Sequence, residues 1–402
     1  MCARPRGVRV WSPWRAVVGF GVVSLAADMV YEGARSVYGP LLGSLGASAL
    51  VVGAVTGAGE AAALLVRLVS GPLADRTRRY WALTIVGYLL TAVCVPLLAF
   101  TPFLGAAGLA VAAGLILAER IGKAVRSPAK SALLADVAGH VGMGRGLGVH
   151  KALDQVGAFA GPLLVAAMIA TAGGALWPGL AVLAAPGAVA MVLLVITRHR
   201  MPRPATEPIE QPRPRPLPTR FGLPAPFLSF AVSAALCTAG LVTFGLIGFH
   251  LAERQIVPTA AVPLLYAVAM AAGALAALTT GLAYDRLGPR VLLSLPVLVA
   301  AVPPLAFGNA VGPVLVGVLI WGAAVGVQDS TVKALVADLV PRERRATAYG
   351  IFAGVQGAGA LIGGIVAGAV YEWSLAALVG VVAGTQLVAL LLLGPVLRRP
   401  AR

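Results

Sequence analysis

Twelve apolar segments dominate this sequence and restrict what it can fold into. They occupy residues 16–40, 48–71, 82–100, 104–135, 147–170, 175–197, 225–250, 260–284, 290–308, 312–338, 347–370 and 374–396. A helix needs about 20 mostly apolar residues to cross a bilayer, and it satisfies its own backbone hydrogen bonds in lipid. Each segment is long enough for one crossing, so we predict an all-α membrane protein with twelve transmembrane helices.

The amount and placement of charge agree with a membrane protein. Of the 402 residues, 59% are hydrophobic, a share that a soluble fold cannot hide from water. The net charge of +16 comes from Lys and Arg that lie mainly between the apolar segments. Basic residues concentrate in the cytoplasmic loops of membrane proteins. We therefore predict a lipid bilayer and no nucleic acid as partner, with both termini cytoplasmic and Arg254 as the visible exception.

A break divides the twelve segments into six and six. The stretch RHRMPRPATEPIEQPRPRPLPTR at 198–220 is rich in Pro and Arg and lacks apolar periodicity. It predicts an extended cytoplasmic linker. We assign 1–197 to an N-terminal six-helix bundle, 198–224 to the linker and 225–402 to a C-terminal six-helix bundle. SALLADV at 131–137 matches KALVADL at 333–339. Two related halves of this kind are typical of transporters that rock around a site at mid-membrane.

Two loops carry a repeated charged motif, GPLADRTRRY at 71–80 and GLAYDRLGPR at 281–290. They resemble the motif G-x-L-A-D-R-x-G-R-R of the major facilitator superfamily, between helices 2 and 3 and between helices 8 and 9. The resemblance covers the whole chain and implies two pseudo-symmetric six-helix bundles. Arg78 stands where the family has Gly. The family's conformational latch falls on Gly71, Asp75, Arg76, Arg79, Gly281, Asp285, Arg286 and Arg290, with Asp75 expected to bind the opposite half.

The fifth segment contains GVHKALDQVGAFAGPLL. Its Gly148, Gly157, Gly161 and Pro162 resemble part of the antiporter motif of proton-coupled drug exporters in this superfamily. The trailing Gly-Gly of that motif is Val165-Ala166 here. Close helix packing explains the same spacing of small residues, so export and packing both remain open.

Ionisable residues inside the apolar segments are the main functional candidates, because charges within a membrane are costly and usually mark function. We select Asp28, Glu32, Glu60, Glu119 and Asp154 as proton-coupling candidates, with Asp28 and Glu32 first. Arg120 joins them because it falls where many family members carry a membrane-embedded arginine. Static ion pairs are the competing interpretation: Glu32 with Arg35, Glu60 with Arg67, and Asp154 with Lys151.

Substrate contacts are expected from both halves. The candidates for the substrate cavity are Tyr31, Arg35, Lys123, Arg126, Thr238, Thr243, Trp321, Gln328, Asp329 and Lys333. The N-terminal half contains most of the charges, which resembles transporters that handle protons in that half and adapt the other half to substrate. An apolar cavity with few polar anchors suits an amphipathic small molecule.

We predict a secondary transporter of the bacterial inner membrane that works as a monomer and exchanges a small organic molecule for protons. The main alternative is proton-coupled uptake of an anionic nutrient that binds Lys123, Arg126 and Arg120. A receptor or scaffold that does not transport is a remote alternative. An enzyme is not expected, because Ser127-x-x-Lys130 lacks its companion motifs and no HExxH, GxSxG or phosphate loop is present. The scattered His and Cys residues predict no metal site, and we expect no cofactor.

Overall fold

The computed structural model describes residues 11–201, 224–340 and 345–397, and within these ranges the regular structure is helical. The first half contains α1 (Pro13–Arg35), α2 (Tyr38–Ser44), α3 (Ala49–Thr77), α4 (Tyr80–Leu97), α5 (Gly108–Gly139), α6 (Met143–Thr171), α7 (Leu176–Ala181) and α8 (Ala184–Arg200). The second contains α9 (Ala225–Gly240), α10 (Phe244–Glu253), α11 (Ala261–Leu287), α12 (Ser294–Ala306), α13 (Val311–Leu339), α14 (Arg345–Trp373) and α15 (Leu375–Leu397). Short 3-10 turns cover Leu98–Phe103, Gly105–Ala107 and Gly288–Leu293.

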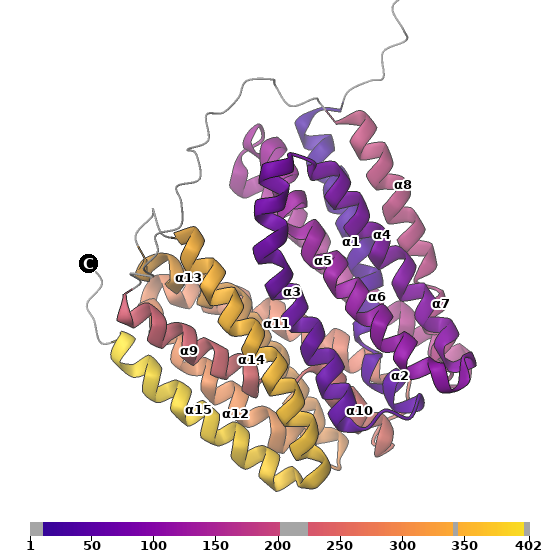
Figure 1. Cartoon of the computed structure of the whole chain (residues 1–402), viewed down its shortest axis with the longest axis vertical. Coiled ribbons are helices and arrows are strands. Elements are labelled where there is room, and N and C mark those ends of the chain that lie inside the picture. The colour runs from indigo at the N-terminus through magenta and orange to yellow at the C-terminus, as the bar shows by residue number, and fades with distance from the viewer. Residues whose placement is uncertain (1–10, 202–223, 341–344, 398–402) are drawn as a thin grey trace, which may run out of the picture.

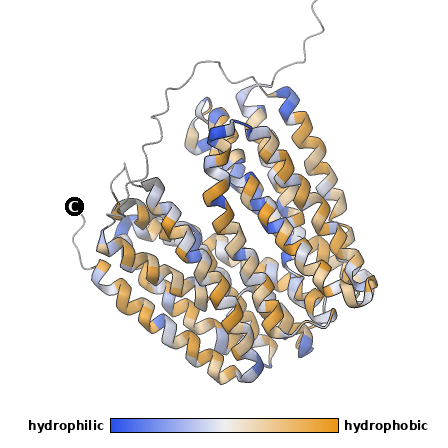
Figure 2. Cartoon of the chain, in the orientation of Figure 1, coloured by the Kyte–Doolittle hydropathy of each residue, from blue (hydrophilic) through white to orange (hydrophobic). Residues whose placement is uncertain are grey.

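The predicted all-α membrane fold is confirmed. In the described ranges, eleven segments are long and apolar enough to span a bilayer. The longest, Ala261–Ala306, contains both α11 and α12, which accounts for the twelfth crossing. Figure 2 shows apolar residues along most of each helix and hydrophilic residues at helix ends and within the N-terminal half. The first crossing of each half is divided by a short break into two helices, α1 and α2 in the N-terminal half and α9 and α10 in the C-terminal half.

The two halves repeat one packing scheme. Helix α6 packs on α1 in the first half, and α14 packs on α9 in the second. A Cβ at Gly157 or Gly161 would overlap a backbone oxygen of α1, and one at Gly363 would overlap the oxygen of Ala239 in α9. The packing interpretation is therefore confirmed for Gly157 and Gly161, beside a buried Pro162. It is wrong for Gly148, where an added Cβ would meet open space.

The two ends of the molecule differ. We call the end at which α8 stops and α9 begins the linker end; there Trp11 N–H donates to Arg200 O at 2.8 Å. The opposite, far end contains the α1–α3 and α14–α15 connections. Figure 1 shows the two halves close together at the far end and diverging towards the linker end. The far-end contacts join α2 to α10 and α3 to α14.

Glycines allow this far-end approach. A Cβ at Gly53 would overlap the backbone oxygen of Gly364, and a Cβ at Gly368 would overlap that of Ala49. The far end is also bonded across the halves, because Glu372 accepts from the N–H of Leu50 at 2.8 Å, near the N-terminus of α3. This contact satisfies one of the amide donors that a helix start leaves free.

The loop motifs lie at the linker end, on the diverging side. Asp75 is exposed and accepts a hydrogen bond from Tyr80 of its own half at 3.2 Å. Arg78 ends α3 in the left-handed conformation with φ 52°, which explains why Gly is the more favourable residue there. The latch between Asp75 and the opposite half stays a prediction.

Replacing Gly364 by Leu is expected to open the far end, because the side chain cannot fit against Gly53. Overpacking of this kind costs about 1–3 kcal/mol, which would lower the population of the far-end-closed state roughly 5- to 150-fold. Nitroxide labels at Ser44 and Trp373, in a variant without native cysteines, would report longer distances across the far end.

Gly380→Leu is the matched control, because an added Cβ there meets nothing within 4 Å. Its label distances should equal those of the parent. Equal distances in Gly364→Leu would contradict the assignment of this glycine to far-end closure.

Candidate functional site

A cavity of about 500 Å³ lies between the halves. Its walls come from α1, α3, α5 and α6 on one side and α9, α11, α13 and α14 on the other. Thr56 and Thr243 bond across the halves at 2.8 Å, and Thr243 lines the cavity. The described lining includes five acids, Asp28, Glu32, Glu60, Asp154 and Asp329, and six cations, Arg35, Arg67, Lys123, Arg126, Lys130 and Lys151.

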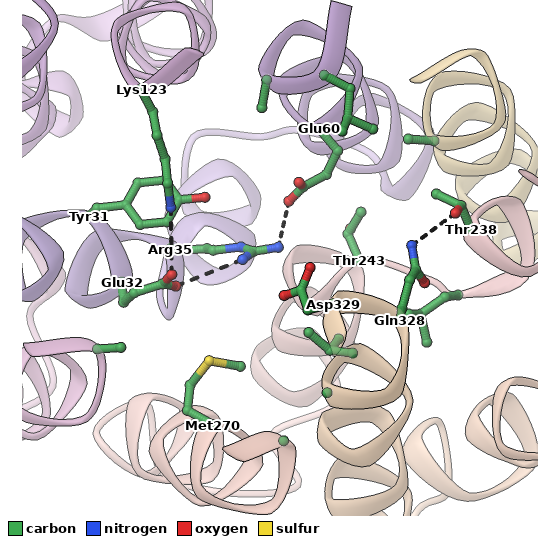
Figure 3. A pocket seen from close by; sticks show the side chains of 18 of the residues that line it. Tyr31, Glu32, Arg35, Glu60, Lys123, Thr238, Thr243, Met270, Gln328 and Asp329 are labelled. Carbon is green, nitrogen blue, oxygen red and sulfur yellow. Dashed lines mark hydrogen bonds and ion pairs between the residues drawn. The ribbon is translucent and has the colours of Figure 1, made fainter. Parts of the chain in front are cut away.

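A network of ion pairs forms the deep part of the N-terminal wall. Arg35 contacts Glu60 at 2.5 Å and Glu32 at 3.8 Å. Lys123 lies 3.8 Å from the other oxygen of Glu32 (Figure 3). Arg120 approaches Glu60 at 3.3 Å and is almost fully buried. Five of the predicted site residues therefore come together, which lowers the cost of holding each charge inside the membrane.

Tyr31 holds two of these cations in place. The ammonium of Lys123 lies 3.1 Å from the centroid of the Tyr31 ring, and the guanidinium of Arg120 lies 4.9 Å from it. Arg120 also donates a hydrogen bond to the Tyr31 hydroxyl. A cation near a ring face is attracted by the negative potential of the ring, so Tyr31 fixes the orientation of both side chains.

One bond ties this network to the other half. Tyr266 in α11 donates its hydroxyl to Glu32 at 2.5 Å. The Tyr266 ring packs against Phe244 at 4.6 Å and Trp321 at 6.1 Å, both in the C-terminal half. Tyr266 is not among the residues predicted from the sequence, because a single tyrosine within an apolar segment carries no signal of a partner in the other half. Glu32 is thus shared between the cationic side chains of one half and a hydroxyl of the other.

A second charged group lies closer to the linker end. Asp154 pairs with Lys151 at 3.1 Å, and Lys130 donates to Ser24 at 3.0 Å. Asp28 lines the cavity one helical turn before Glu32 on α1. Two of the predicted acids therefore face the same cavity as the deep network.

Glu119 lies away from the cavity. Its side chain is fully buried and accepts from Thr91 of α4 at 3.3 Å. Arg126 donates to the same Thr91 at 2.5 Å and lies 4.5 Å from the Tyr88 ring centroid, while part of it lines the cavity. Glu119 and Arg126 therefore fasten α4 to α5.

The C-terminal wall contains fewer charges. Gln328 and Gln356 both donate to Thr238, at 2.9 and 3.3 Å. Met270, Trp321 and Phe352 are among the apolar lining residues. Asp329 projects from α13 into the same space (Figure 3). The side chain of Lys333 lies outside the described residues. The asymmetry expected from the sequence, charges on one wall and apolar groups on the other, is present.

The static pairs have mixed outcomes. The pairs of Glu32 with Arg35 and of Asp154 with Lys151 are confirmed. The pair of Glu60 with Arg67 is wrong, because α1 and α5 bring Arg35 and Arg120 to Glu60. The packing of separate helices determines which cation pairs with Glu60, whereas sequence spacing relates only residues on the same helix. Within the described residues, no cluster of His, Cys, Asp and Glu could hold a metal ion.

Comparisons with known proteins extend over nearly the whole chain. The sequence matches the family described as Major Facilitator Superfamily at residues 20–255 and 247–402. An uncharacterized protein of Mycobacterium tuberculosis is 51% identical over 385 residues, which cover 95% of this chain and 93% of the relative.

Among solved structures, a variant of the nucleoside transporter NupG has a TM-score of 0.78 at 14% identity, covering 95% of this chain and 100% of that one. A variant of the peptide transporter POT has a TM-score of 0.75 at 16% identity, covering 96% and 94%. At these identities the likeness concerns the fold.

Glu60→Gln is expected to destabilise the protein, because it removes the shared carboxylate of Arg35 and Arg120. Loss of one partner of a buried ion pair costs about 3–5 kcal/mol. Since the Glu60 side chain is 29% exposed, we expect about 2 kcal/mol. Thermal unfolding in lipid nanodiscs would measure the fall in midpoint.

Lys151→Gln serves as control, because the Lys151 side chain is 73% exposed and its pair with Asp154 is worth about 0–1 kcal/mol. Equal shifts in the two variants would contradict a stabilising role for the deep network.

Proposed function

Since this chain belongs to the Major Facilitator Superfamily, we propose that it is a proton-coupled exporter of small amphipathic molecules. The fold supports secondary transport, in which two six-helix halves rock around a central cavity. The similar solved structures include transporters of nucleosides and of peptides, so fold likeness leaves the substrate of this chain open. The proposal on coupling and direction rests on this chain's own residues.

The shared position of Glu32 carries the proposal. Its carboxylate binds Arg35 and Lys123 in one half and Tyr266 in the other. Protonation of Glu32 would weaken all three contacts, because a neutral carboxyl no longer attracts the cations or accepts a charge-assisted bond. A proton on Glu32 would therefore favour separation of α1 from α11 at the floor of the cavity. Proton binding is thereby linked to the equilibrium between the state open at the linker end and the state open at the far end.

Asp28 is the second proposed proton carrier. It lies about one turn closer to the linker end on the same helix and lines the cavity with Lys130 and Asp154. A proton entering the cavity from the linker end would reach Asp28 before Glu32. Glu60, Asp154 and Arg120 then act by balancing charge, while Glu119 remains a candidate that acts through Arg120, 3.9 Å away.

The expected orientation is compatible with export. With both termini in the cytoplasm of a bacterial inner membrane, the linker end faces the cytoplasm, and the cavity lies on the cytoplasmic side of the far-end contacts. A molecule leaving the cell would enter here and depart after the far end opens. The exposed loop motifs would then close the linker end, with Asp75 as the latch. We propose that the chain acts as a monomer without cofactor or enzymatic activity.

The alternative, uptake of an anionic nutrient, has less support, because the three cations predicted to bind the anion already have partners within the chain. Arg120 and Lys123 are already paired with Glu60 and Glu32, and Arg126 is bonded to Thr91. Uptake remains an outcome of the experiment below.

Glu32→Gln and Asp28→Asn are each expected to reduce coupled transport. Proteoliposomes with an acidic interior and a pH-sensitive dye would report compound-dependent proton release, which is expected for export by exchange. Coupling energies of 1–3 kcal/mol predict roughly 5- to 150-fold slower proton movement in either variant. Acidification driven by an inward compound gradient would instead establish symport.

Glu253→Gln is the matched control, because Glu253 is an exposed acid at the end of α10, outside the cavity. It should retain parental rates. Parental rates in Glu32→Gln and Asp28→Asn as well would exclude both acids as carriers.

A further inference from the structure

Three described cavity cations, Arg67, Arg126 and Lys130, have no ion pair with an acid, and of these Arg67 also lacks a hydrogen bond to any described residue. We propose that the transported molecule is an amphipathic organic anion and that the Arg67 guanidinium binds its carboxylate or other acidic group. This assigns a substrate class to the cavity and rests on the proposed transport function. The arrangement of charges, the geometry at Arg67 and the chemistry of the opposite wall each support it.

The charge balance of the cavity favours one negative charge from outside the chain. Among the described lining residues, six cations face five acids. The deep acids Glu32 and Glu60 are shared by Arg35, Lys123 and the adjacent Arg120. In the group nearer the linker end, Asp154 is occupied by Lys151. An unmatched cation in a membrane interior is costly, so an anionic ligand is favoured over a neutral or cationic one.

Arg67 itself forms no hydrogen bond or ion pair with any described residue. Its Nε is buried and has no hydrogen-bond partner, although the side chain lines the cavity. Buried polar groups almost always have partners, so a guanidinium at the cavity wall that has no acceptor among the described residues favours an acceptor on a ligand for its donors that face the cavity. Guanidinium groups match carboxylates and phosphates with two parallel hydrogen bonds.

The other cations near the cavity are engaged. Lys130 donates to Ser24, and Arg126 donates to Thr91 and lies over the Tyr88 ring. Arg67 is seven residues beyond Glu60 on α3, about 10 Å nearer the linker end. An anion entering from that end would meet Arg67 before it reached the neutralised deep network.

The opposite wall explains why the anion should be amphipathic. Met270, Trp321 and Phe352 offer apolar contact, and Gln356 and Thr238 supply neutral hydrogen-bonding groups. A cavity of about 500 Å³ lies within the range of small-molecule sites, which are roughly 300–1,000 Å³. A molecule with an acidic group at one end and an aromatic or aliphatic body at the other satisfies both walls.

Three probes of similar size and different charge would test this. We would titrate 1-naphthylacetate, its neutral isostere 1-naphthylacetamide and the cation 1-naphthylethylammonium into the full chain in nanodiscs, using calorimetry. The anion is expected to bind at least about tenfold more tightly than either other probe, since hydrogen bonds to charged groups favour it. Equal binding of all three, binding of none, or preference for the cation would overturn the proposal.

Three variants connect the preference to Arg67. Arg67→Gln should remove the preference for the anion, and Arg67→Lys should retain part of it, because the charge remains without the planar fork. Arg78→Gln removes the exposed arginine that caps the end of α3, about three turns beyond Arg67, and should change nothing. An unchanged preference in Arg67→Gln would overturn the assignment. Thermal unfolding of each variant confirms that the protein compared is folded.

The test separates this inference from the proposed function. Selective binding of the anion without any coupled proton movement would leave the substrate class standing and reject proton coupling. Proton-coupled transport of cationic or neutral compounds would leave the transport function standing and reject the role of Arg67. The binding assay and the proteoliposome assay therefore fail independently.

Discussion

Pairing of charges within an apolar medium is the constraint on which this molecule depends. A charge in the bilayer interior needs a partner or water, and the N-terminal half contains so many charges that they must pair with one another. Glu32, Arg35, Glu60 and Arg120 do so through ion pairs shared across three helices. Because each acid serves more than one cation, a change in one protonation state alters several contacts at once. The network can therefore stabilise the fold and also respond to protons.

The scaffold around the network is symmetric, while its lining is not. Glycines of α6 and α14 pack in the same way on α1 and α9, so both halves are built by one scheme. The lining departs from this symmetry, with charges on one wall and apolar and amide groups on the other. In the proposed function, similar halves serve the rocking motion, and the two different walls serve the proton and the organic substrate. The Tyr266–Glu32 bond joins these surfaces at the floor of the cavity.

Far-end closure depends on weak contacts spread over a large surface. Glycine backbones approach one another along α3 and α14, and two cross-half hydrogen bonds at Thr56 and Leu50 accompany them. No single contact of this kind is strong, since each is worth about 1 kcal/mol. In the proposed mechanism, a modest change in charge at Glu32 would be enough to reverse a closure built in this way. Strong closure would trap one state and prevent transport.

The sequence by itself determined the class of fold, the twelve crossings, the two halves and most of the charged cavity residues. Each of these follows from local properties, such as apolar length, the pairing of motifs or the high cost of a charge in lipid. Only the tertiary structure decided the partners. It gave Glu60 to Arg35 and Arg120, placed Tyr266 on Glu32, turned Glu119 towards α4 and left Arg67 without an acid. Periodicity reports which face of one helix a residue occupies, while a partner is set by how separate helices pack.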